Sequence, residues 1–283
     1  LSEKHGGDGA AVRDEVLARI GARDAGVWSA QPDPTRAGLA LGDLADLVRS
    51  AAAVAREDDE EHQRAALVSR ACEAVPEASR ARVVEFLSEL LRIGVAEPSP
   101  QLRAARDEPT LLGDQVRRAF DDLVLAELAR APLALVVEDL QWADAASVRA
   151  ISDVARLARD RPLFVLLLGR PEAKDTHLRL VADRQPTGVA LGKLGQKAME
   201  KLVAEALAAS GASDPSIVAT IAQRAGGNPF FAEELIRAER AGQGGSSPSL
   251  AALAVLESRL TSLEPEARRV LRAGSVFGPQ FSS

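Results

Sequence analysis

Cysteine is almost absent from this sequence, which contains only Cys72. A single cysteine excludes a framework of internal disulfide bonds and fits a reducing compartment, so we expect a cytoplasmic protein. No run of apolar residues approaches the roughly 20 that a membrane-spanning helix needs, and no signal peptide opens the chain. We therefore expect no membrane partner.

Basic residues are also fewer than acidic ones. The chain has 35 Lys and Arg against 41 Asp and Glu, a formal net charge of -6. Nucleic-acid binding needs clustered cations to neutralise phosphates, so we do not expect this segment to bind nucleic acid directly. Its histidines, His5, His62 and His177, are scattered without the spacing of metal ligands, and no Ser-His-Asp or Cys-His arrangement can be argued.

What the sequence does have is a large apolar fraction, 46% of 283 residues, and two uninterrupted apolar runs. Leu133–Val137 follows Pro132, and Leu163–Gly169 comes later in the chain. Runs that are apolar throughout are typical of parallel strands covered by helices on both faces. We predict an α/β fold with a parallel sheet, to which Ala25–Ala30 and Gly188–Leu191 add shorter strands.

Two acids, Glu138 and Asp139, follow the first apolar run directly. Open α/β sheets place their chemistry at the carboxyl ends of the strands. A pair of acids there suits nucleotide hydrolysis, in which one carboxylate holds Mg²⁺ and the other orients the attacking water. Taken alone the pattern is weak, because a strand-end acid often only caps the next helix.

The segment Glu138–Asp144, Glu-Asp-Leu-Gln-Trp-Ala-Asp, resembles the Walker B segment of STAND-type ATPases, the AAA-like signalling ATPases of large bacterial regulators. Asp114–Phe120 is similar to modules attached to Ser/Thr kinase domains, and Gly226–Phe231 resembles the lid motif of the same family. The resemblance implies a P-loop NTPase-type core with a helical lid, ATP or ADP with Mg²⁺, and self-association. It also implies an attached effector, either a kinase or a DNA-binding domain of a LuxR-type transcriptional regulator.

The resemblance assigns Mg²⁺ coordination to Glu138 and water activation to Asp139. Arg170, at the end of the second apolar run, would sense a γ-phosphate; the alternative is that it pairs with Glu138 or Asp139 to neutralise the strand ends. Asn228 and Pro229 would lie near the nucleotide, although helix capping alone also explains an Asn-Pro pair.

The phosphate-binding loop is where the sequence departs from the family. A working loop needs Gly-x-x-x-x-Gly-Lys-Ser/Thr, and this pattern is missing from the chain. The Gly-rich start, with Gly6, Gly7 and Gly9, lies at the expected place, but Gly9 falls at the lysine position and Ala10 at the hydroxyl position. We expect either a degenerate loop or a fragment whose loop lay upstream. Two hypotheses follow: an ATP-dependent regulatory module, or a catalytically inactive scaffold or sensor with the same fold.

The remaining pattern is helical. We predict a core over 1–194 with a helical insertion near 39–106, a lid over 195–241, a linker at 242–248 and the truncated start of a helical or winged-helix domain at 249–283. The chain begins at Leu1 rather than Met, so we expect a fragment. Expected helices cover 12–20, 110–130, 145–158, 196–210, 215–225, 229–241, 250–263 and 265–274, and a polar connector covers 94–108.

Overall fold

The structure, a computed structural model, describes residues 8–21, 24–36, 40–170, 173, 177, 186–208, 214–240 and 265–274. The chain divides into two compact units, whose main segments are Gly9–Leu191 and Gly192–Ser283. Each unit has its own apolar core.

The first unit is built on a parallel sheet of β1 (Gly26–Ala30), β2 (Leu133–Val137) and β3 (Leu163–Leu167), in the order β1-β2-β3. The register aligns Trp28 with Leu135 and Leu135 with Val165. All five residues of the central strand β2 are buried, which explains why its sequence carries no polar residue. The mixed α/β class and the parallel sheet were predicted from these apolar runs and are confirmed.

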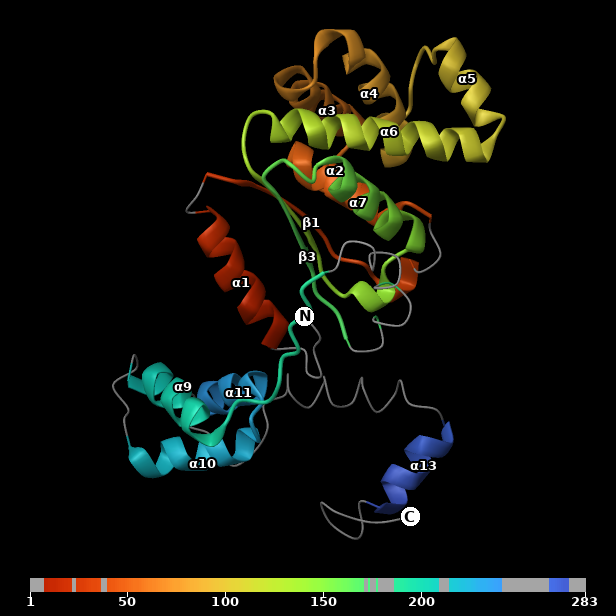
Figure 1. Ribbon diagram of the computed structural model, residues 1–283. Coiled ribbons are helices and arrows are strands. Elements are labelled where there is room, and N and C mark those ends of the chain that lie inside the picture. Colours follow the sequence, from red (N-terminus) through yellow and green to blue (C-terminus); the bar gives the residue numbers. More distant parts are fainter. Residues whose placement is uncertain are drawn as a thin grey trace. The chain divides into compact units, whose positions relative to one another are not determined.

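Helices cover both faces of this sheet (Figure 1). On one face, α2 (Gly42–Ala52) and α7 (Ala145–Leu157) share a core with Trp28 and Leu135. On the other face, α1 (Asp8–Gly21) packs Val16 and Leu17 against Val136 and neighbouring β3 residues. The second face is the less completely covered one, since Phe164 there is 46% exposed.

A layer of four helices lies beyond α2 and α7: α3 (Glu60–Ala74), α4 (Glu77–Leu91), α5 (Pro100–Arg106) and α6 (Pro109–Leu128) (Figure 1). Leu67, Phe86 and Phe120 are completely buried between them. The predicted helical insertion is therefore confirmed as helical. Asp59 begins α3 by accepting a hydrogen bond from His62 N at 2.9 Å, so the acidic run at 57–61 starts a helix.

Two sequence predictions in this unit were wrong. The expected connector at 94–108 contains α5, where Ser99 caps the helix, Pro100 takes its first position, and Leu102 and Ala105 are buried. The expected strand at 188–191 is reduced to a single bridged residue, Ala190. Val189 is 49% exposed, so this segment lacks the burial that would favour a strand. Short 3₁₀ turns occur at Pro34–Arg36 and Leu140–Trp142.

The second unit contains α9 (Gln196–Ala208), α10 (Pro215–Ala225) and α11 (Pro229–Arg240), which enclose Met199, Val203 and Ile221. The helices predicted for the lid region are confirmed within two residues at each end. A further helix, α13 (Pro265–Gly274), matches the predicted one. The predicted linker at 242–248 and the helix at 250–263 lie outside the described residues.

The turn between α10 and α11 follows the predicted capping chemistry. Gly226 ends α10 in the left-handed region at φ 59, and Gly227 continues at φ 83. A Cβ on Gly227 would lie 2.8 Å from the Leu194 carbonyl oxygen, so glycine is required by both conformation and space. Asn228 then caps α11 by accepting from Phe230 N at 3.0 Å.

In the helices that the structure describes, no segment combines the length and the apolar character needed to cross a bilayer.

Candidate functional site

The predicted acids lie where β2 ends. Glu138 extends the ladder by one bond, its backbone N donating to Ala30 O at 3.0 Å. Asp139 then turns the chain with φ 44 and ψ 43, the left-handed region, and the 3₁₀ turn at Leu140–Trp142 follows. Aspartate tolerates this conformation better than most residues, and such backbone outliers concentrate at functional sites. The two carboxylates therefore follow one another at the carboxyl edge of the sheet.

Gln141 connects the ends of β2 and β3. Its Nε2 donates to Asp139 Oδ1 at 2.9 Å, and its Oε1 accepts from the backbone N of Arg170 at 3.1 Å. The strand ends approach closely here, because Leu140 N donates to Leu168 O at 2.9 Å. A Cβ on Gly169 would lie 2.8 Å from Leu140 Cβ, so only glycine permits this approach. The amide of Gln141 thus fixes Asp139 relative to Arg170.

Arg13 of α1 holds Glu138. Its Nη1 donates to both carboxylate oxygens, at 2.9 Å to Oε1 and 2.7 Å to Oε2. The side chains are 29% and 18% exposed, so the pair is partly shielded from water. Arg13 also contacts Asp14 at 2.8 Å. The bond to Glu138, followed by that to Asp14, raises the pKa of Arg13.

Arg170 does not play the alternative role considered for it. Its side chain is exposed, and among the described residues no ion pair joins it to Glu138 or Asp139. The arginine that neutralises the strand end is instead Arg13, more than a hundred residues earlier in the sequence. A phosphate-sensing role for Arg170 stays a prediction.

Mg²⁺ was expected on Glu138 and Asp139, and oxygen ligands are chemically right for it. In this arrangement they do not fit the ion, because both oxygens of Glu138 already accept from a guanidinium. Within the described ranges, no group of three or more His, Cys, Asp or Glu side chains is placed to hold a metal ion. We therefore assign no chemical step to a metal here.

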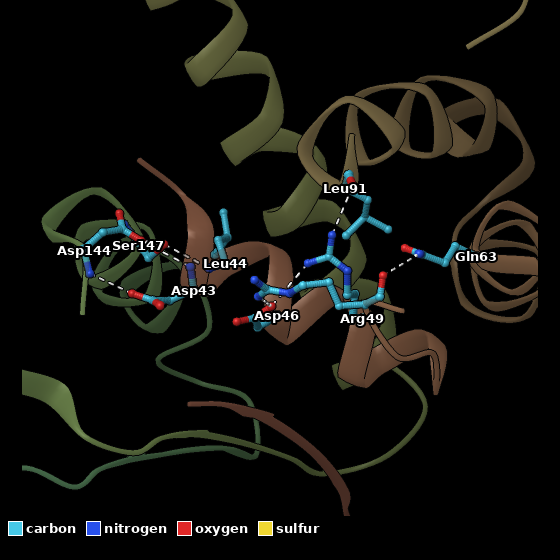
Figure 2. A network of polar contacts seen from close by, with 9 residues as sticks. Asp43, Leu44, Asp46, Arg49, Gln63, Leu91, Asp144 and Ser147 are labelled. Atoms are coloured by element: carbon cyan, nitrogen blue, oxygen red, sulfur yellow. Dashed lines mark hydrogen bonds and ion pairs between the residues drawn. The ribbon is translucent and has the colours of Figure 1, made fainter. Parts of the chain in front are cut away.

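A second polar cluster joins α2 to α7 (Figure 2). Asp144, the N-cap of α7, accepts from Ser147 N at 2.8 Å and also from Leu41 N at 3.0 Å and Asp43 N at 3.2 Å. In return, Asp43 Oδ2 accepts from Asp144 N at 2.7 Å, and Ser147 Oγ accepts from Leu44 N at 2.9 Å. One aspartate therefore caps two helices.

The buried carboxyl of Asp43 has an altered acidity. Burial raises the pKa of Asp43 to about 7, and the neighbouring charge of Asp144 adds a smaller increase. The hydrogen bond from Asp144 N acts in the opposite direction and lowers the pKa. His177 lies close enough to Asp144 to feel its charge, and it is 5% exposed. Burial lowers the pKa of His177, and the charge of Asp144 opposes that shift.

The other predicted site residues belong to other elements or fall outside the described residues. Gly9 lies in the first turn of α1, while Gly6 and Gly7 fall outside the described residues. Asn228 and Pro229 begin α11 in the second unit, where capping accounts for both. Arg117, in the segment Asp114–Phe120 that carries part of the resemblance, forms an ion pair with Asp114 one turn away on α6.

A wide groove also lies in the helical layer, with a volume of about 1290 Å³. It runs between α3, α4 and the segment before α5, and its lining includes Val68, Arg80 and Ser99. None of the predicted site residues that the structure describes lines it. The acid pair and this groove are therefore separate features of the first unit.

Sequence reasoning missed Arg13, Gln141 and Asp43. Arg13 sits in an ordinary helical pattern, and nothing local distinguishes it from Arg19 on the same helix, which pairs with exposed Glu15. Asp43 lies in the region predicted to be helical. An acid near the start of a helix is expected to interact favourably with the helix dipole at the surface, so its burial was not predicted. Their roles depend on partners that are distant in sequence.

Comparison with known proteins returned no match: no protein-family model, no curated protein and no solved structure resembles the chain closely enough to be significant.

Proposed function

We propose that this chain is a nucleotide-responsive regulatory module of a multidomain bacterial signalling protein. ATP or ADP would bind at the carboxyl edge of the sheet, and the nucleotide state would switch an attached kinase or DNA-binding effector in the cytoplasm. The three helices of the second unit would act as the lid. This assignment follows the resemblance of three segments, Asp114–Phe120, Glu138–Asp144 and Gly226–Phe231, to STAND-type ATPases.

The observation that supports it best is the position of Glu138 and Asp139. Both follow the fully buried central strand of a parallel sheet, at the edge where open α/β sheets bind their ligands. Asp139 is further held by Gln141, which also contacts the chain at Arg170. Asp139 is then the residue that would orient an attacking water, and Arg170 the one that would contact phosphate.

Isothermal titration of the whole chain with ATP and with ADP, in the presence of Mg²⁺, tests this proposal. We expect micromolar binding that weakens at least tenfold in Asp139→Ala and changes little in Glu138→Ala, because the Glu138 carboxylate is already paired with Arg13. Asp160→Ala is the matched control, because Asp160 is a surface acid that is 85% exposed, and its removal should leave binding unchanged. Circular dichroism establishes that each variant is folded. Absence of binding by the folded wild-type chain would contradict the proposal.

A second candidate is a scaffold or sensor of the same fold that binds no nucleotide. Two observations favour it: the chain has no Gly-Lys-Ser/Thr loop, and Glu138 is already neutralised by Arg13. The scaffold hypothesis predicts no heat from either nucleotide and identical behaviour of all three variants. The titration therefore separates the two functions.

A further inference from the structure

Arg13 occupies the position on Glu138 where a metal cation would be expected. A single guanidinium nitrogen donates to both carboxylate oxygens, at 2.9 and 2.7 Å. These are the lengths of charge-assisted hydrogen bonds, which are about twice as strong as neutral ones. The cation is therefore part of the protein chain and is already bound.

The position of Arg13 is supported from three sides. Val16 and Leu17, about one turn further along α1, pack against the sheet. Asp14 contacts the same guanidinium at 2.8 Å. Glu138 is held by its backbone, whose N donates to Ala30 O and so extends the hydrogen bonds between β1 and β2. With a 29% exposed arginine and an 18% exposed glutamate, the pair is less screened by water than a surface pair.

Divalent cations and this arginine compete for the same lone pairs. Mg²⁺ and Mn²⁺ prefer carboxylate oxygens as ligands, and Glu138 and Asp139 would supply two carboxylates that are adjacent in sequence. An ion that binds there must first separate Arg13 from Glu138 and leave a partly buried guanidinium without that partner, which costs free energy.

We propose that Arg13 is the internal counter-cation of the acid pair Glu138–Asp139 and that it keeps the pair from binding a divalent metal ion. The consequence is a strand-end acid pair whose affinity for metal is set by a residue of α1. The inference goes beyond the proposed function, since it concerns the metal ion alone and stands whether or not a nucleotide binds.

Mn²⁺ titration of the whole chain, followed by the electron paramagnetic resonance signal of the free ion, tests the proposal without any activity measurement. We expect Arg13→Gln to gain one Mn²⁺ site at least tenfold tighter than any site of the wild type. Arg19→Gln is the matched control, because Arg19 lies on the same helix but is 78% exposed and, within the part of the chain that the structure describes, pairs with Glu15. It should behave as the wild type does.

The double variant Arg13→Gln/Glu138→Gln must lose the gained site, because the released carboxylate is removed. A gain that survives in the double variant, or an Arg13→Gln variant that gains nothing, overturns the proposal. If Arg13→Gln does not fold, the wild-type chain and Glu138→Gln are compared instead. Mn²⁺ binding by the wild type that Glu138→Gln abolishes would overturn the proposal. Wild-type binding that Glu138→Gln leaves unchanged supports it.

Discussion

At the level of single residues, the chemistry of an acid in this protein is decided by its nearest partner. Glu138 and Asp139 are neighbours in sequence, yet one is held by an arginine and the other by the amide of Gln141. A charged partner neutralises a carboxylate, whereas an amide leaves its charge in place. Among the described residues, Asp139 is consequently the acid of this pair whose carboxylate bonds to no cation.

Asp43 provides a prediction about pH. Its pKa in the folded chain is about 7, above the ordinary value of 3.8, so between these values the folded state binds more protons than the unfolded state. The free energy of unfolding must then fall as the pH rises through this window. Asp43→Asn keeps an oxygen to accept from Asp144 N but removes the charge. We expect it to be stabilising at pH 8 by on the order of 2 kcal/mol and nearly neutral at pH 4.

Urea unfolding of the wild type and the variant at a series of pH values measures this difference. Asp144, Asp46 and His177 lie in or near the same cluster, so the variant is compared with the wild type at each pH. Asp121→Asn is the matched control, because burial raises the pKa of Asp121 to only about 6 and its effect should level off at lower pH. A difference that does not change with pH would refute a shifted Asp43.

At the level of secondary-structure elements, helix caps follow local sequence rules, whereas the contacts that a capping residue makes elsewhere in the fold do not. Asp59, Ser99, Asp144 and Asp214 each cap the helix that follows them, as local sequence rules require. Asp144 does more, because it also accepts from the first turn of α2, about a hundred residues earlier. A local rule cannot anticipate that second bond.

Asp144→Ala should therefore cost more than an ordinary cap. It removes acceptors for backbone N–H groups of two helices, and we expect a loss of roughly 2–3 kcal/mol. Asp59→Ala removes the cap of α3 alone and should cost about 1 kcal/mol. Urea unfolding midpoints at unchanged m-value give both numbers. Equal losses in the two variants would mean that the bonds to α2 contribute nothing.

At the level of the whole molecule, two separate cores predict that unfolding is not a single transition. Leu135 and Met199 are each completely buried, one in the core of the first unit and the other in that of the second. Replacing either by alanine should cost about 2–5 kcal/mol in its own unit. By differential scanning calorimetry, we expect Leu135→Ala and Met199→Ala to lower different transitions. If both variants lower one shared transition equally, the units unfold together.

The division into two units allows the sheet edge and the lid to be tested separately on one chain. The acid pair belongs to the first unit and the Gly226–Phe231 turn to the second. Binding that weakens in Asp139→Ala reports on the sheet edge alone. A nucleotide effect on the calorimetric transition of the second unit would report on the lid.

The sequence by itself determined the class of fold and most of the helices and strands. Uninterrupted apolar runs are typical of a covered parallel sheet, and the 3.6-residue period with capping residues located helices such as Thr110–Arg130 and Pro215–Ala225. Weakly periodic segments were harder, because α5 is too short for a period and Val189 is apolar yet exposed.

The tertiary structure alone decided which charges meet. The pairing of Arg13 with Glu138 and the sharing of Asp144 by two helices join residues more than a hundred positions apart. Side-chain electrostatics depends on distances of a few ångströms, and such distances between remote residues exist only once the chain has folded. The sequence therefore placed the two acids at a strand end, and the fold decided that one of them is already neutralised.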